Sequence, residues 1–206
     1  MGHLIAAALG YLIGTSSMAL YLSKLQKVNL RAGGSGNLGA SNTMQLMGWK
    51  AGVLVALHDI GKAVLAVLLA RMLFPNLPYV EAVAGVASVL GHIFPFYLKF
   101  KGGKGLASYF GMTLALDWKL ALLVGAAIVI VTLVTDYIVC GTVTTVVMVP
   151  AYVGLIGHSW LLAGILAIAT VVILCRHTDN YRRIWNGTEF GLRSAIRGDN
   201  RLDKKK

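Results

Sequence analysis

Long apolar stretches separated by short polar segments dominate the chain, and they predict helices that cross a membrane. A helix needs about 20 apolar residues to cross the hydrocarbon core. Strands of a membrane barrel would instead alternate polar and apolar residues. Seven candidate spans follow from the pattern: Gly2–Ser23, Ala51–Phe74, Val80–Leu98, Leu106–Leu116, Trp118–Thr135, Tyr137–Gly157 and Trp160–Cys175. We therefore predict an all-α membrane protein, a bundle of seven transmembrane helices, in which residues 1–206 form one domain.

The fourth candidate span, Leu106–Leu116, is the shortest, since eleven residues at about 1.5 Å each extend only about 16 Å. It is either a tilted or half-buried helix or the first part of one long helix, Leu106–Thr135. The long helix would carry Asp117 and Lys119 near the bilayer centre, which costs several kcal/mol. We therefore favour a turn in which Asp117 caps the next helix and Trp118 lies at the interface.

Composition supports the membrane interpretation. Hydrophobic residues make up 57% of the chain and charged residues only 13%, whereas a soluble domain carries about 25% charged residues. The mean hydropathy is +0.72. Cys140 and Cys175 lie inside apolar runs, so we expect free thiols rather than a disulfide.

The net charge of +11 is distributed unevenly over the predicted loops. With seven spans, sixteen of the nineteen Lys and Arg residues fall on one side, two fall on the other, and Lys62 lies within a span. The positive-inside rule then places the N-terminus outside and the C-terminus in the cytoplasm. Six spans would move the whole segment after the last span to the outside, with its nine basic residues and its basic tail at about residues 190–206. We therefore prefer seven.

The first polar segment, residues 33–42, is rich in Gly, Ser and Asn, and it contains a G-x-G-x-x-G at Gly34, Gly36 and Gly39. A dinucleotide-binding fold requires a strand before this motif. A membrane span precedes it here, so we reject that interpretation. Glycines let a loop expose N–H groups, and Ser and Asn add donors without charge. The segment suits a phosphate; a flexible turn is the alternative.

The second segment runs from Gly91 to Gly105. It places Lys104 between glycines at the start of a helix, which combines a point charge with free N–H groups. It is not a Walker A loop, because Gly105 follows the lysine where Ser or Thr would be required. His92 alone is more typical of a satisfied histidine at a helix end.

The third segment, residues 176–189, follows the last span directly. Arg176 can grip a phosphate with two hydrogen bonds, and His177 is a candidate general acid or base. A basic anchor for anionic lipid is the alternative, and from Arg193 onward that alternative is strong.

Asp59 and Lys62 lie three residues apart within a span and therefore share a helix face. They form either a structural ion pair or the floor of a site. A basic, glycine-rich site with charges inside the membrane would also suit an anion transporter. Transporters, however, usually show repeated halves with broken helices. This sequence shows no such repeat, and its candidate site lies in loops, which argues against a transporter. The sequence contains no cluster of zinc ligands.

The three segments together resemble the bacterial acyl-phosphate:glycerol-3-phosphate acyltransferases, the PlsY family. The family patterns G-S-G-N-x-G-A-[ST]-N, G-H-x-F-P-x4-F-K-G-G-K-G-x-A and R-H-x-x-N-x-x-R-x3-G-x-E match residues 34–42, 91–107 and 176–189. Asp59 and Lys62 match a family D-x-x-K. Order, spacing and chain length also fit.

The resemblance implies a multi-pass enzyme of the bacterial cytoplasmic (inner) membrane, with its active site facing the cytoplasm. It implies transfer of an acyl chain from acyl phosphate to the 1-hydroxyl of glycerol 3-phosphate, as the first step of phospholipid synthesis. The products are 1-acylglycerol 3-phosphate (lysophosphatidate) and phosphate. It implies no cofactor, no metal and no nucleic acid. We expect a monomer surrounded by membrane lipid.

The resemblance also indicates site residues. Lys104 and His177 are the expected catalytic residues, although the substrate's own phosphate is a rival to His177 as the base. A larger set would hold phosphate groups and the developing oxyanion: Ser35, Gly36, Asn37, Ser41, Asn42, His92, Gly102, Gly103, Arg176 and Asn180. Supporting positions are Asp59, Lys62, Gln45, Thr142 and Glu189.

Two positions depart from the family pattern, Gln45 and Leu38, and Leu38, in place of a commoner Pro or Val, should matter little. Gln45 stands where the family often has Arg, which removes one cation from the expected phosphate pocket, and Lys50 is a candidate to compensate. Thr142, just inside the sixth span, fits a family Ser position.

Overall fold

The computed structural model describes residues 1–197, and every regular element within that part of the chain is a helix. Residues 198–206, which include most of the predicted basic tail, lie outside the described residues. The elements are α1 (Gly2–Thr15), α2 (Met18–Leu25), α3 (Ala40–Met47), α4 (Trp49–Leu73), α5 (Val80–Ile93), the 3-10 helix η1 (Phe96–Leu98), α6 (Leu106–Leu116), α7 (Trp118–Thr135), α8 (Ile138–Leu155), α9 (Trp160–Arg176), α10 (Thr178–Trp185) and α11 (Leu192–Arg197).

Helices occupy all seven stretches that hydrophobicity predicts, but not all of them are long enough to cross a membrane. Five stretches pass by length and composition: Gly2–Leu25, Trp49–Leu73, Val80–Leu98, Trp118–Thr135 and Ile138–Leu155. A sixth is added if α9 and α10, which are bent by 45°, are counted together, and α6 is a shorter apolar helix. The all-helical fold is confirmed, whereas the count of seven spans and the orientation of the termini stay predictions.

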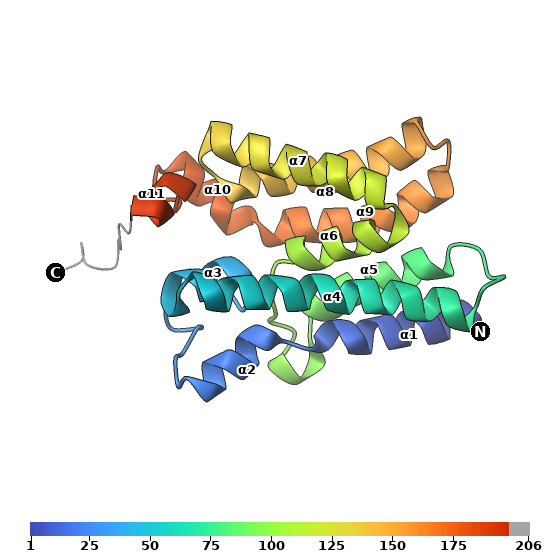
Figure 1. The fold of residues 1–206 in the computed structure, drawn as a ribbon, viewed down its shortest axis with the longest axis horizontal. Coiled ribbons are helices and arrows are strands. Elements are labelled where there is room, and N and C mark those ends of the chain that lie inside the picture. The colour runs from blue at the N-terminus through green and yellow to red at the C-terminus, as the bar shows by residue number, and fades with distance from the viewer. Residues whose placement is uncertain (198–206) are drawn as a thin grey trace.

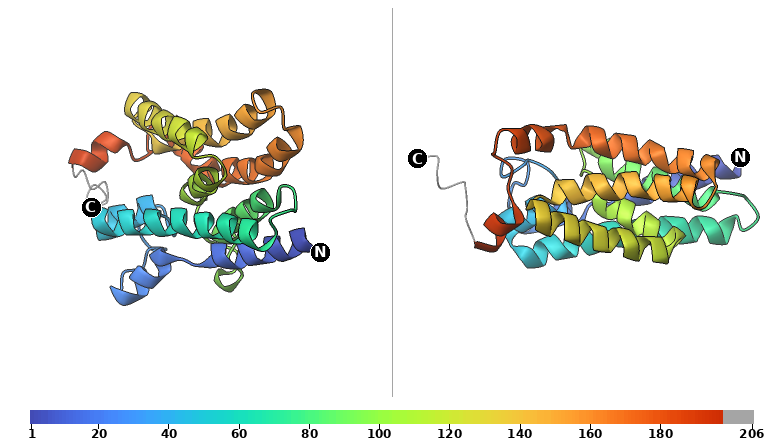
Figure 2. Two further views of the ribbon diagram at one scale, coloured as in Figure 1. Left: turned by 45° about the vertical axis from the view of Figure 1, so that its right-hand side comes forward. Right: turned by 90° about the horizontal axis from the view of Figure 1, so that it is seen from above.

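The helices form two groups with α6 between them (Figure 1). One group contains α1, α4 and α5, and the other contains α7, α8 and α9. Figure 2 shows the same arrangement from two further directions. Figure 1 places α3, α10 and α11 at one end of the bundle and the N-terminus at the other.

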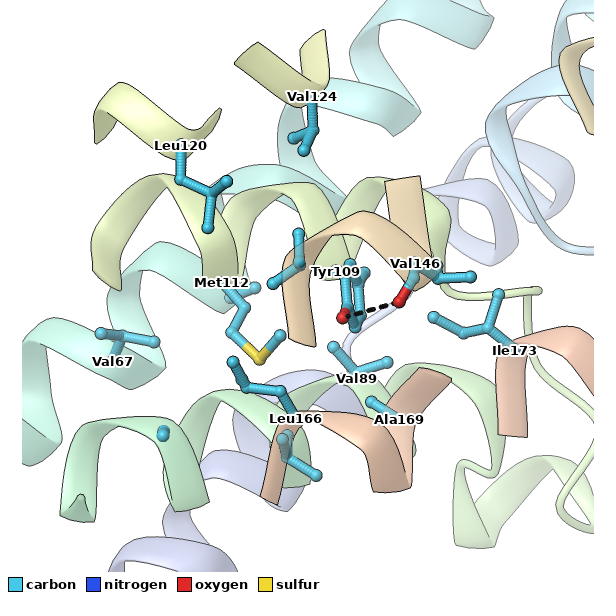
Figure 3. Packing of buried hydrophobic residues seen from close by; sticks show 14 of the residues in the cluster. Val67, Val89, Tyr109, Met112, Leu120, Val124, Val146, Leu166, Ala169 and Ile173 are labelled. Atoms are coloured by element: carbon cyan, nitrogen blue, oxygen red, sulfur yellow. Dashed lines mark hydrogen bonds between the residues drawn. The ribbon is translucent and has the colours of Figure 1, made fainter. Parts of the chain in front are cut away.

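The core is packed around α6 (Figure 3). Tyr109 and Met112 of this helix are fully buried against side chains from the neighbouring helices. The Tyr109 hydroxyl lies 3.0 Å from Oγ1 of Thr170 on α9 and donates to the carbonyl oxygen of Val146 on α8. Because a buried hydroxyl needs a partner, this contact ties α6 to both helices.

Small residues bring α1 unusually close to α5. A Cβ at Gly10 would lie 2.2 Å from the carbonyl oxygen of Ala84, and one at Gly14 would lie 2.0 Å from that of Ser88. Such contacts between backbones are typical of packed membrane helices.

Two interruptions shape the middle of the bundle. The first is at Ser16 and Ser17, where α1 ends and α2 begins. At the second the chain leaves α5, forms η1 and turns back into α6 beside the middle of α4 (Figure 1). The turn between α6 and α7 agrees with the prediction, because Asp117 accepts N–H bonds from Lys119 and Leu120 at 2.9 and 3.0 Å. The interrupted helices leave room for polar groups inside the bundle.

Candidate active site

A basic pocket of about 350 Å³ lies where the three predicted polar segments meet. Its wall is formed by Arg31, Ser35, Gly36, Asn37, Lys101, Gly102, Lys104, Cys175, Arg176, Thr178, Asp179 and Arg183. Five of these side chains are basic and one is acidic. The prediction that the three segments share one face is therefore consistent with the structure, and the charge of the wall suits an anionic ligand.

The first segment owes its shape to Asn42, which is 2% exposed. Its Oδ1 accepts the N–H of Ser35 at 2.8 Å, and its Nδ2 donates to the carbonyl oxygens of Leu30 and Asn37, both at 2.9 Å. Gly34 adopts a φ of +57°, and a Cβ there would lie 2.2 Å from Oδ1 of Asn42. Asn42, expected among the phosphate-binding residues, instead braces the loop that carries them.

The second segment is seated on the end of α5. The N–H of Gly102 donates to the carbonyl oxygen of Ile93 at 2.9 Å, and that of Gly103 donates to His92 at 3.1 Å. The N–H groups of these two glycines, which the sequence places among the phosphate-binding residues, are thus paired with carbonyls that the end of α5 leaves unsatisfied. Gly105 has a φ of +98° and is the N-cap of α6, so the turn favours glycine there.

The third segment contributes Arg176, the last residue of α9. Its guanidinium lies 6.0 Å from the ring centroid of Phe94. Its Nε is buried and has no hydrogen-bond partner among the described residues. Arg176 is therefore held in place by packing while part of its donor capacity is unused, which suits an incoming phosphate.

A chain of polar contacts connects the second and third segments. The Lys104 ammonium donates to Oδ1 of Asn180. Nδ2 of Asn180 donates to Oε1 of Glu189 at 2.6 Å, and Nε of Arg183 donates to Oε2 of the same carboxylate at 2.6 Å. Glu189, predicted as a supporting residue, thus holds both Asn180 and Arg183.

The surroundings of Lys104 lower its pKa below that of an ordinary lysine. Burial is the main cause, because it disfavours the charged form. The nearby guanidinium of Arg183 lowers the pKa further. The carboxylates of Glu189 and Asp179 act in the opposite direction.

His177 is buried behind the wall, with an exposed fraction of 5%. Its Nδ1 lies 2.8 Å from the carbonyl oxygen of Ile173. A carbonyl can only accept, so Nδ1 carries a proton and Nε2 is the acceptor in a neutral ring. His177 is not among the wall residues.

Several other predicted residues also lie away from the wall. Ser41 is exposed in the first turn of α3, and the Gln45 side chain lies against Gly34. Thr142 is 1% exposed, and its hydroxyl donates to the carbonyl oxygen of Ile138 within α8. Asp59, Lys62 and His92 form a separate buried cluster.

Six residues of the wall were not predicted as site residues: Arg31, Lys101, Cys175, Thr178, Asp179 and Arg183. The sequence signal is strongest for Lys101 and Arg183, which hold fixed positions of the second and third motifs, and Thr178 and Asp179 stand between two residues of the third motif. Arg31 offered no local signal. Its guanidinium reaches the pocket by donating to the carbonyl oxygen of Lys101, 70 positions away.

No group of three or more His, Cys, Asp and Glu side chains that could hold a metal ion occurs among the described residues. Cys140 and Cys175 are free thiols, as predicted.

Comparison with known proteins gives one consistent result. A family model described as "Glycerol-3-phosphate acyltransferase" matches residues 4–187. A glycerol-3-phosphate acyltransferase of Coxiella burnetii (strain CbuG_Q212) is 38% identical over 191 residues, which cover 92% of this chain and 97% of the relative.

Two crystal structures of PlsY (YgiH), described as an integral membrane glycerol 3-phosphate acyltransferase, have the same fold. The glycerol 3-phosphate form has a TM-score of 0.87 at 30% identity and covers 93% of this chain and 96% of its own. The lysphosphatidic acid form has a TM-score of 0.84 at 29% identity and covers 93% and 95%.

Proposed function

The chain belongs to the glycerol-3-phosphate acyltransferase family, and from this premise we propose that it acylates the 1-hydroxyl of glycerol 3-phosphate with an acyl phosphate as donor. The products are 1-acylglycerol 3-phosphate and inorganic phosphate. Family membership also decides between the two functions considered from the sequence, since the relatives are acyltransferases and not anion transporters.

The observation that carries the proposal is the excess of basic side chains on the pocket wall. Arg31, Lys101, Lys104, Arg176 and Arg183 face one pocket together with a single carboxylate. Both proposed substrates carry phosphate, and guanidinium and ammonium groups are the side chains that bind phosphate best. The solved relative named above was crystallised in a glycerol 3-phosphate form, which supports the same acceptor for this chain.

The proposed reaction is a direct transfer. The acceptor hydroxyl attacks the carbonyl carbon of the acyl phosphate, a new ester C–O bond forms, and the bond from that carbon to the phosphate oxygen breaks. The donor is already activated, so a covalent enzyme intermediate is unnecessary. Ser35, Asn37, Lys104 and Arg176 would hold the phosphates and stabilise the developing oxyanion.

The proton of the attacking hydroxyl needs an acceptor. Nε2 of His177 has a free lone pair when Nδ1 donates to Ile173, which supports a protein base. The position of His177 behind the wall favours the rival, in which a phosphate oxygen of the substrate takes the proton. Turnover of His177→Ala with both substrates saturating separates the two, because near-normal turnover assigns the proton to the phosphate.

We further propose that the enzyme is a monomeric, single-domain protein of the bacterial inner membrane that crosses it seven times, with the pocket facing the cytoplasm. The positive-inside rule supports this orientation, because α2 with Lys24, the loop after it with Lys27 and Arg31, and α10 with Arg182 lie toward the same end of the bundle (Figure 1).

The decisive experiment supplies the purified protein with palmitoyl phosphate and labelled glycerol 3-phosphate. We expect labelled lysophosphatidate, and no product when palmitoyl-CoA replaces palmitoyl phosphate. Product from palmitoyl-CoA alone would overturn the choice of donor. The variant Arg176→Ala tests the role of the pocket in the same assay, and we expect it to raise the KM for glycerol 3-phosphate.

A further inference from the structure

A buried polar cluster lies in the middle of the bundle, apart from the pocket wall. It consists of Asp59 and Lys62 on α4 and His92 near the end of α5, which are 3%, 6% and 7% exposed. Nζ of Lys62 lies 2.7 Å from Oδ1 of Asp59, 2.7 Å from the carbonyl oxygen of Ser16 and 2.9 Å from Nδ1 of His92. Each of the three N–H groups of the ammonium therefore has an acceptor.

This cluster joins the two interruptions of the helical bundle. Ser16 follows the last residue of α1, and His92 lies beside the last residue of α5. Lys62 reaches both from the middle of α4. Nδ1 of His92 also lies 3.3 Å from Oδ1 of Asp59. Charged side chains inside a span usually face the bundle interior and pair with one another, and here the pair also fixes the imidazole ring.

The fixed ring supports the loop that leads to the pocket. The carbonyl oxygen of His92 accepts the N–H of Gly103 at 3.1 Å. A Cβ at Gly103 would lie only 2.0 Å from Nε2 of His92, and one at Gly102 would lie 2.0 Å from the His92 carbonyl oxygen. Real Cβ atoms essentially never approach so closely. Gly103 thus rests directly on the ring, and the next residue is Lys104 of the wall.

We propose that Asp59, Lys62 and His92 are positioning residues of the active site. They do not touch substrate. Asp59 and Lys62 hold the His92 ring, the ring sets the position of Gly102 and Gly103, and this loop sets the place of the Lys104 ammonium in the pocket. The proposal rests on the proposed function, since the pocket must bind a phosphate for this placement to matter.

One test neutralises the charged pair with the double variant Asp59→Asn/Lys62→Met. We expect the KM for glycerol 3-phosphate to rise about tenfold or more, because a small displacement of a binding group is enough to weaken its contact. The change in kcat should be smaller than the change in KM. A lower Tm in detergent with an unchanged KM would make the pair merely structural and would overturn the proposal. Gly61→Ala is the matched control, because Gly61 is exposed on the same helix and a Cβ there meets no atom within 4 Å.

The second test is a double-mutant cycle between His92 and Gly103. Gly103→Ala should raise the KM for glycerol 3-phosphate, because the new methyl group collides with the imidazole. In the His92→Ala background that collision is gone, so adding Gly103→Ala should leave the KM close to that of His92→Ala alone.

If the two substitutions instead multiply their effects on KM, His92 and Gly103 act independently, and the proposal is overturned. The wild-type protein in the same assay distinguishes this result from failure of the proposed function. A wild type that makes no lysophosphatidate from palmitoyl phosphate contradicts the proposed function. An active wild type, together with KM effects of His92→Ala and Gly103→Ala that multiply, contradicts only the positioning role.

Discussion

Lys104 shows how the pocket sets the charge of a single side chain. Burial and the guanidinium of Arg183 favour the neutral amine, whereas the carboxylates of Glu189 and Asp179 favour the ammonium. The net effect is a pKa below the ordinary value of a lysine. Because phosphate binding needs the charged form, this lysine is a link between pH and substrate affinity.

The sign of the pH effect follows from this lowered pKa. Lys104 loses its proton as the pH rises through the pKa, so the KM for glycerol 3-phosphate should increase toward alkaline pH. Lys104→Arg should shift that increase to higher pH, because a guanidinium stays charged up to a pH of about 12. KM measured from about pH 7 to about pH 9.5 tests this, well below the pKa of an unperturbed lysine near 10.4. If KM depended on pH identically in the wild type and in Lys104→Arg, a group other than Lys104 would cause the increase in KM at alkaline pH.

Residue types could be predicted from the sequence better than residue positions. Lys104, Arg176, Ser35 and Asn37, which were predicted as site residues, lie on the pocket wall. Asn42 does not, because its amide is fully used by three backbone groups of its own loop. A motif shows that an asparagine is required but not whether its partner is a ligand or the chain itself.

At the scale of the element, Asn42 makes three of the side-chain hydrogen bonds that stabilise the loop at residues 30–42. Asn42 lies in the first turn of α3 and makes its contacts backward, to Leu30, Ser35 and Asn37. Asn42→Ala should therefore lower the free energy of unfolding by about 1–3 kcal/mol and raise the KM for glycerol 3-phosphate. Thermal unfolding in detergent and steady-state kinetics measure the two effects.

The control for that prediction is Asn76→Ala. Asn76 is exposed in the loop between α4 and α5 and makes no side-chain hydrogen bond found in the described part of the chain. We expect little change in either quantity. If Asn42→Ala behaved like this control, the hydrogen bonds of Asn42 would not be what holds the loop.

Helix positions could be predicted closely where local signals are complete. Leu106–Leu116 and Trp118–Thr135 have the predicted bounds, because Asp117 is both a helix end and a cap. The interruption at Ser16 could not be predicted, since two serines in an apolar run give no strong signal. The group that satisfies the Ser16 carbonyl oxygen, Lys62, is 46 positions away.

At the scale of the whole molecule, the three polar segments meet at one pocket, although Figure 2 shows them entering the bundle from different helices. The count of basic residues could predict this gathering because it depends only on which segments share a side. It could not predict the turn from α5 into α6 beside the middle of α4, which depends on packing between distant helices.

The predicted orientation can be measured by labelling single cysteines in intact cells, in a background with Cys140→Ala and Cys175→Ala. A membrane-impermeant maleimide should label Asn76→Cys, at the end opposite the pocket, and should not label Lys27→Cys until the cells are opened. Both positions are exposed. The reverse labelling pattern would place the pocket outside the cytoplasm.

The cluster around Lys62 also has a consequence for biogenesis. Its members appear during synthesis in the order Asp59, Lys62, His92, after Ser16, whose carbonyl oxygen Lys62 contacts, and all of these residues precede residue 103, about halfway along the chain. Because Asp59 and Lys62 lie three positions apart on one helix, α4 leaves the ribosome with its two charges already able to neutralise each other. The residues that support Gly102 and Gly103 can therefore come together in the nascent chain before α9 is synthesised. The pocket is complete only after α9 has added Arg176.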